Sequence, residues 1–129
     1  MSLENVTVRL SDQGKDQLIR LKRITGIKNW NVLCRWALCM SLADQSPPLV
    51  REVQTNSNVE MSWRTFAGSA GNEYTSLLEE RMTSTNEGFP DIYALFLAHL
   101  HRGIGQLAGT LDNRSGIDGL IDLAMRTEH

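Results

Sequence analysis

The sequence has no long hydrophobic run. None of its 129 residues belongs to an apolar stretch approaching the roughly 18 consecutive positions that a membrane-spanning helix requires. Its first residues also lack the charged-then-apolar pattern of an export signal. We therefore expect a cytoplasmic protein. Its length fits one domain with a modest core.

Cysteine is scarce, with only Cys34 and Cys39 in the chain. Five residues apart on a predicted helix, their side chains point about 140° apart, which does not favour a disulfide. The sequence has no second cysteine pair that would suggest a structural metal or redox motif. We interpret both thiols as reduced and as small hydrophobic side chains.

Recognisable catalytic motifs are also missing, including phosphate-binding loops and nucleophile elbows. Gly103, Gly105 and Gly109 are spaced one residue too widely for a dinucleotide fingerprint, and they follow a helix. We expect them to end or kink that helix, or to admit another backbone. His99 and His101, two apart on a helix, point in nearly opposite directions, so they do not share a metal ion. We expect them to be structural or interfacial, and we predict no enzyme activity, cofactor or metal.

Acidic residues are absent between Asp16 and Asp44, and the charge of the chain is strongly asymmetric. Residues 1–40 hold seven basic and three acidic side chains, whereas residues 41–129 hold six basic and twelve acidic ones. A net charge of +4 at one end indicates a surface that faces a polyanion. Solubility, or pairing between subunits, accounts for the same asymmetry equally well.

The first 43 residues predict a strand, a helix and a second helix. Alternation in the strand turns Thr7 and Arg9 away from its apolar face. Lys15, Lys22 and Arg23 lie opposite the apolar face of the first helix. The second helix is apolar nearly all round, which predicts burial on every side at a subunit interface. The three elements are expected over residues 5–10, about 12–25 and about 30–43.

The remaining residues predict a mainly helical continuation of the same single domain, 1–129. Pro47 and Pro48 end the second helix, and a polar loop follows. We expect residues 61–67 to form a strand or an anchored loop. Further helices are predicted over residues 73–82, 91–106 and 115–126. The domain thus comprises a basic unit, 1–43, and an acidic helical portion, 44–129, that is suited to assembly.

A strand, helix, helix unit of this kind resembles the ribbon-helix-helix fold. In such dimers two strands pair into a ribbon that enters the major groove, and the second helices interleave. Outward strand residues then face base edges, while helix lysines and the start of the second helix, after Lys28, face phosphates. A solvated helix face is the alternative for the lysines. The candidate DNA-contacting residues are Thr7, Arg9, Lys15, Lys22, Arg23 and Lys28.

Five short segments, taken in order, resemble the DndE family of DNA sulfur modification proteins. Each is weak individually, and their order along the chain is the stronger signal. The segments are Val6–Ser11, the stretch from Leu18 ending Arg23-Ile24-Thr25-Gly26, Asn31–Ala37, Trp63–Phe66 and Phe96–Ile104.

The resemblance implies a non-catalytic, DNA-associated component of a system that replaces a non-bridging phosphate oxygen with sulfur. It implies an oligomer, a tetramer, that binds duplex DNA, including nicked duplexes, through a lysine-rich surface. The chemistry would lie on partners: a cysteine desulfurase, an ATP-using iron–sulfur protein and an SMC-like ATPase. Two alternatives stay open, namely a ribbon-helix-helix regulator that reads a palindrome through Thr7 and Arg9, and a protein–protein adaptor.

Overall fold

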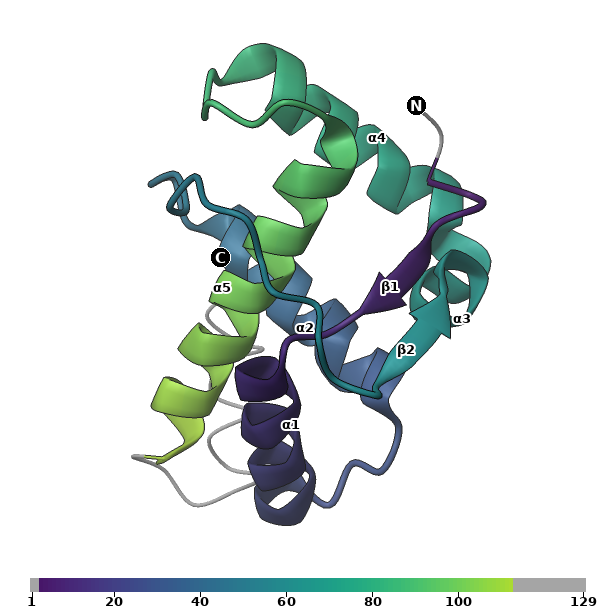
Figure 1. The fold of residues 1–129 in the computed structure, drawn as a ribbon, viewed down its shortest axis with the longest axis vertical. Helices are drawn as coiled ribbons and strands as arrows, with labels where there is room; N and C mark the ends of the chain where they lie inside the picture. The colour runs from purple at the N-terminus through teal and green to yellow at the C-terminus, as the bar shows by residue number, and fades with distance from the viewer. Residues whose placement is uncertain (1–2, 113–129) are drawn as a thin grey trace.

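The computed structural model describes residues 3–112 and is mainly helical (Figure 1). Helix α5 runs between two ends of the molecule, with α4 at one end and α1 at the other, and a two-stranded sheet lies to one side. The predicted helix over residues 115–126 lies outside the described residues. The elements are β1 (Thr7–Arg9), α1 (Asp12–Thr25), α2 (Trp30–Ala43), β2 (Glu60–Ser62), α3 (Trp63–Ala67), the 3₁₀-helix η1 (Gly68–Ala70), α4 (Gly71–Ser84) and α5 (Ile92–Asp112).

Strand β1 has the predicted alternation but an unpredicted partner. Val8 and Leu10 are fully buried, while Thr7 and Arg9 are exposed. The strand pairs antiparallel with β2 of the same chain, and Val8 lies opposite Met61. The predicted ribbon, formed by the β1 strands of two chains, is therefore not confirmed. Strand β2 has the same alternation of inward and outward side chains and pairs with β1 within one chain.

Helix α1 follows the sequence prediction closely. The Ser11 hydroxyl accepts a hydrogen bond from the Gly14 amide at 3.0 Å and caps the first turn. Gly26, with a φ of 75°, ends the helix in the left-handed region, which glycine adopts without a steric clash because it has no Cβ atom. Leu18 and Leu21 are fully buried, so the apolar face of the helix was predicted correctly.

Helix α2 finds much of its burial inside the chain, against α5, while its predicted position at a subunit interface stays a prediction. Its inner face, including Cys34, Ala37 and Ser41, is fully buried and packs along α5 in the most extensive helix–helix contact of the fold. Its outer face carries the exposed Cys39 and Ala43. Helix α5 provides the packing surface for the inner face because it continues through its glycines as one helix.

Gly103 allows α2 and α5 to cross with their backbones in contact. A Cβ atom on Gly103 would lie 1.7 Å from the carbonyl oxygen of Ala37. One role predicted for the glycines, the close approach of another backbone, is confirmed here. The prediction that they end the helix is wrong. Helix α5 continues through Gly103 and Gly105 to Asp112, because glycine weakens a helix by only about 1 kcal/mol, and packing offsets this cost.

The segment 61–67 forms a short strand followed by a helix, not the single strand or loop that was expected. Trp63 and Phe66 occupy one face of α3, three residues apart, and both are buried. Their rings pack against Phe96 of α5, with centroids 5.3 and 5.2 Å away. The Ser62 hydroxyl caps α3 by accepting from the Thr65 amide. This aromatic cluster packs α3 against α5.

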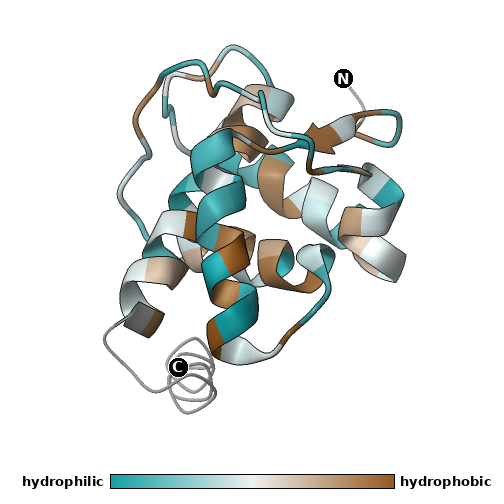
Figure 2. Ribbon diagram, turned by 60° about the horizontal axis from the view of Figure 1, so that its bottom comes forward, coloured by the Kyte–Doolittle hydropathy of each residue, from teal (hydrophilic) through white to brown (hydrophobic). Residues whose placement is uncertain are grey.

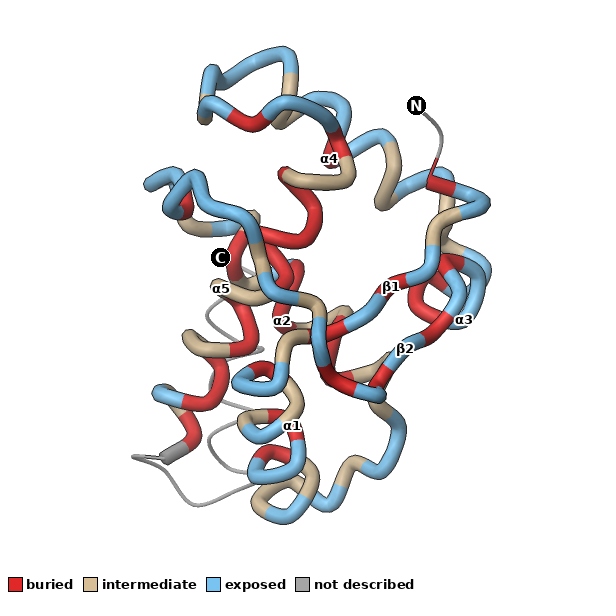
Figure 3. The backbone as a smooth tube through the Cα atoms, viewed as in Figure 1, coloured by how far each residue is buried: buried red, intermediate tan, exposed pale blue. Residues whose placement is uncertain are grey.

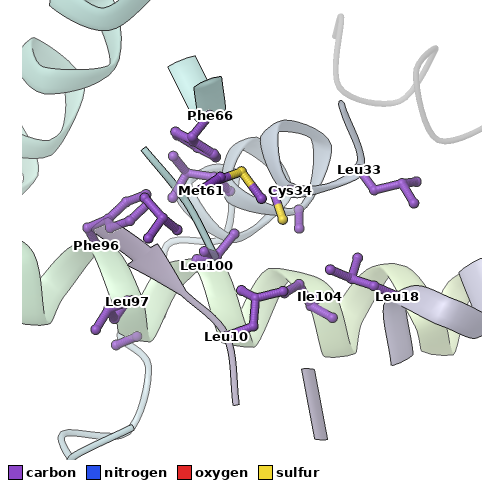
Figure 4. Packing of buried hydrophobic residues seen from close by; sticks show 14 of the residues in the cluster. Leu10, Leu18, Leu33, Cys34, Met61, Phe66, Phe96, Leu97, Leu100 and Ile104 are labelled. Atoms are coloured by element: carbon purple, nitrogen blue, oxygen red, sulfur yellow. The ribbon is translucent and has the colours of Figure 1, made fainter. Parts of the chain in front are cut away.

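One hydrophobic core joins strands β1 and β2 and helices α1 to α5. Figure 4 shows side chains from α1, α2, β2, α3 and α5 gathered together with Leu10, which directly follows β1; among them are Leu18 and Ile104. Figure 3 shows the buried positions along α2 and α5 and the exposed positions over the loop between α2 and β2. Figure 2 shows apolar and hydrophilic residues mixed along the helices, as amphipathic helices require. No helix within residues 3–112 is long and apolar enough to cross a membrane.

Candidate nucleic-acid interface

Thr7 and Arg9 lie on the exposed face of β1, as the alternation predicted. Arg9 is not a free cation, however. Its guanidinium forms an ion pair with the carboxylate of Glu60, the residue directly opposite on β2, and its Nε donates to Glu60 Oε2 at 3.1 Å. Both side chains are about half exposed, so the pair is weak in stability terms. The ion pair nevertheless neutralises Arg9, the basic side chain that the two strands would present to DNA.

The two aligned lysines of α1 lie beside different neighbours. The Lys15 ammonium donates to the Asn58 side-chain oxygen at 2.6 Å, in the segment that leads into β2. The Lys22 ammonium lies 3.7 Å from the ring centroid of Trp30, at the start of α2. A cation above an aromatic face keeps its full charge while its position is restrained. These contacts join one flank of α1 to the segment before β2 and to the start of α2, and neither neighbour is acidic.

Arg23 and Lys28 complete the predicted set. Both are exposed, and neither forms an ion pair within residues 3–112. Asn29 occupies the N-cap position of α2, but its side chain makes no capping hydrogen bond, and the first turn contains no acidic residue. We call Lys15, Lys22 and Lys28 the lysine face. Arg23 lies at the outer side of α1, with Asp12 and Asp16 on the same helix.

The sequence did not reveal the polar network at the other end of α2. His99 is fully buried and hydrogen-bonds Ser41 Oγ through Nδ1 and Glu87 Oε1 through Nε2, both at 2.8 Å. Glu87 also accepts from Arg81 Nε at 2.9 Å. Burial lowers the pKa of His99, more than the hydrogen bond to Glu87 raises it. Neutral His99 therefore donates to Glu87 and accepts from the Ser41 hydroxyl.

This serine, histidine and glutamate set resembles a hydrolytic triad only in its residue types. Ser41 is fully buried, and its oxygen accepts a hydrogen bond from Arg102 Nε at 2.8 Å. A nucleophile must reach a substrate, and this hydroxyl does not. Arg81 and Arg102 instead donate to the last carbonyls of α2, Leu42 O and Ser41 O. The network caps and anchors the carboxyl end of α2.

His101 has a separate task, as the opposite directions of an i, i+2 pair predicted. Its Nε2 accepts the Ser11 amide at 3.0 Å, and its Nδ1 lies 2.9 Å from the Leu97 carbonyl. These partners require the neutral ring with a proton on Nδ1. Burial lowers the pKa of His101 and favours this form. The ring also packs against Gly14, where a Cβ atom would lie 3.2 Å from Cδ2. His101 therefore ties α5 to the start of α1.

Acid should destabilise the fold progressively. Because burial lowers the folded-state pKa of His99 and His101 below 6.5, the unfolded chain takes up protons first. Stability should thus be complete above about pH 6.5 and fall below it. Burial acts to raise the pKa of Glu87, but hydrogen bonds from His99 and Arg81 hold it below 4.5, so this contribution is lost as pH falls through the lowered value. Urea midpoints measured from about pH 8 to 4 check the prediction; a level profile would contradict it.

Neither cysteine has the character of a nucleophile. Burial raises the pKa of the Cys34 thiol to about 12. Burial also raises the pKa of Cys39, although a hydrogen bond with Tyr74 acts against it. Both thiols are free and stay protonated near neutral pH, whereas thiol chemistry requires the thiolate. Within residues 3–112, no group of three histidine, cysteine or acidic side chains could hold a metal ion.

A groove of about 590 Å³ lies between the start of α1, α5 and the loop after α2. Its lining carries both signs of charge, with Asp12 and Glu52 beside Arg51 and Arg102. A phosphate-binding surface favours one sign of charge. The lysine face, and not this groove, is therefore the better candidate for contact with a polyanion.

Comparison with known proteins identifies the family. A family profile described as "DNA sulphur modification protein DndE" matches residues 7–115. The chain belongs to the DndE family. The match begins at β1 and extends beyond α5, so it includes every candidate DNA-contacting residue. A search of curated proteins found no match.

Solved DndE structures share the fold. The chain superposes on DndE from Escherichia coli B7A, described as involved in DNA phosphorothioation modification, with a TM-score of 0.64 and 22% identity. This alignment covers 78% of the present chain and 94% of the other. A DndE G21/24K mutant, described as involved in DNA phosphorothioation, gives a TM-score of 0.60 at 21% identity, over 80% and 96% of the two chains.

The residues that contact the candidate site were not predicted from the sequence, because most of them lie far from it along the chain. Glu60 is 51 positions from Arg9, and no local pattern couples the two. Asn58, the partner of Lys15, lies in a loop with little periodic signal. A contact between Trp30 and a lysine of α1 has a signal in the sequence. Trp30 is an aromatic residue that begins the helix directly after the lysine-bearing one.

Proposed function

We propose that this DndE family member is a non-catalytic DNA-binding component of a DNA phosphorothioation system and that its lysine face contacts the phosphate backbone. The observation that carries the proposal is the lysine face itself. Lys15, Lys22 and Lys28 come from α1 and the connection to α2, and none of them is paired with a carboxylate within residues 3–112. Unpaired ammonium groups on one surface release counterions when phosphates bind.

Backbone contact is better supported than base reading. The Arg9 guanidinium, the principal candidate for a base contact, is engaged by Glu60, and β1 pairs with β2 instead of forming an intermolecular ribbon. Thr7 remains exposed beside it. We therefore propose sequence-tolerant binding to duplex DNA, nicked duplexes included, and not a repressor-like choice of one operator.

The sulfur chemistry is proposed to lie on partner proteins. Raised pKa values keep Cys34 and Cys39 protonated near neutral pH, and a sulfur carrier needs a thiolate. A cysteine desulfurase, an ATP-using iron–sulfur protein and an SMC-like ATPase are the proposed partners. A homo-oligomer, a tetramer, is proposed as well, with the outer face of α2 around Cys39 and Ala43 available for contact between subunits.

Replacing Lys15, Lys22 and Lys28 together by glutamine should weaken binding strongly to every duplex. Loss of three phosphate contacts should reduce the slope of log K against log salt by about 2.7. Fluorescence anisotropy with intact, nicked and single-stranded DNA across a salt series measures both quantities. The matching glutamate variant, Lys→Glu at the same positions, should show no binding at low salt.

A control variant separates local from overall charge. Ser76, Ser84 and Asn86 are exposed in or next to α4, and replacing them by glutamate changes the net charge by the same three units as the lysine-to-glutamine variant. This control should bind with nearly unchanged affinity. Equal losses in both variants, or no DNA binding by the unmodified protein at low salt, would reject the proposal and favour an adaptor role.

A further inference from the structure

Two segments without acidic residues meet at the start of α2. Residues 17–43 contain Arg20, Lys22, Arg23, Lys28 and Arg35 and no acidic side chain. Residues 61–72 contain Arg64 and again no acidic side chain. The segments touch where the Asn31 amide donates to the Thr65 carbonyl at 3.2 Å. The fold therefore joins two stretches that carry basic side chains and no acidic ones, although they are far apart along the chain.

Arg35 lies at this junction. Its Nε donates to the Asn31 carbonyl at 3.3 Å, so the guanidinium turns back toward the start of α2. A Cβ atom on Gly68 would lie 3.3 Å from Arg35 Nη1, which places the guanidinium against the turn after α3. No carboxylate pairs with Arg35 in the part of the chain that the structure describes. A half-buried cation between α2 and α3 raises the local positive potential.

Arg64 carries the basic surface onto α3. It is exposed, it precedes the Thr65 carbonyl that Asn31 contacts, and it forms no ion pair within residues 3–112. Its neighbours in α3, Trp63 and Phe66, are held in the core by the aromatic cluster. The guanidinium thus extends from a rigid element. Figure 1 shows α3 and the connection from α1 to α2 on the same side of the molecule.

We propose that Arg64, with Arg35 behind it, extends the DNA-contacting surface from the lysine face across the start of α2 onto α3. The inference rests on the proposed function and adds a phosphate contact from outside the basic first 40 residues. A duplex held by the lysine face alone is free to rotate about one line of contacts. A second line on α3 fixes its orientation, because contacts on both sides of the α2 terminus define a surface and not a row.

Arg64→Gln tests the proposal. Duplex affinity at low salt should fall about three- to tenfold, and the slope of log K against log salt should decrease by about 0.9, the value for one lost phosphate contact. Arg64→Lys keeps the charge and should retain the slope. Arg51→Gln is the matched control, because Arg51 is exposed in the loop near His101 and should leave both quantities unchanged.

The outcomes separate this proposal from the one on which it rests. If the lysine variant loses binding but Arg64→Gln matches the unmodified protein in affinity and salt slope, DNA contact through the lysine face stands and its extension onto α3 is overturned. If Arg64→Gln and Arg51→Gln weaken binding equally, the effect is general charge, and the extension is again overturned. If the unmodified protein shows no DNA binding at low salt, the proposed function itself fails.

Discussion

Gly103→Ala should destabilise the protein by about 3 kcal/mol or more, or prevent stable folding. The added Cβ atom would lie 1.7 Å from the Ala37 carbonyl oxygen and 2.4 Å from its carbon. Both are backbone atoms, so no side-chain rotation relieves the overlap. The helices α2 and α5 would have to separate by about 1 Å or more, and a close-packed core does not tolerate such a gap at low cost.

Gly105→Ala provides the matched control two residues along the same helix. Its Cβ atom would meet only the Gln17 amide nitrogen, at 3.9 Å. Alanine is favoured over glycine in a helix interior, so this variant should be stabilised by about 0.5–1 kcal/mol. Urea unfolding followed by circular dichroism compares the two. Similar midpoints for Gly103→Ala and the unmodified protein would show that α2 and α5 do not cross as described.

Glu87→Ala should cost about 3–5 kcal/mol of stability, the range for removing one partner of a buried ion pair. The carboxylate accepts hydrogen bonds from His99 and Arg81 and is almost completely buried. Without it, the neutral His99 ring keeps an N–H group with no acceptor, and Arg81 keeps an unpaired charge. The carboxyl end of α2 would lose its anchor as a consequence.

Glu87→Gln and Glu80→Ala make this result specific. The glutamine oxygen can still accept a hydrogen bond from Arg81. Its NH₂ group can donate to His99 Nε2 once the ring proton has moved to Nδ1. We therefore expect a smaller loss of stability than for Glu87→Ala. Glu80 is exposed on α4, and its removal should change stability by no more than about 0.5 kcal/mol. Equal midpoints for Glu87→Ala and Glu80→Ala in urea unfolding would contradict a structural role for the network.

Local sequence patterns determined the first three elements because their signals act over a few residues. Period-two alternation turned Val8 inward and Thr7 outward, and the apolar periodicity predicted a helix over about residues 12–25, which agrees with α1. The charge of the candidate surface was also legible, since it needed only the count of basic and acidic residues. The order of short motifs was sufficient for the DndE family.

Tertiary structure decided how those elements combine. No local pattern identified a partner strand for β1 within the chain. The fold pairs it with β2, which also places Glu60 beside Arg9. The glycine at position 103 looked the same as its neighbours, and only the crossing with Ala37 distinguishes it. Contacts between residues about 40 to 60 positions apart follow from global packing and leave no local periodicity. The same packing set Arg64 beside the start of α2, which charge counting along the first 40 residues could not have revealed.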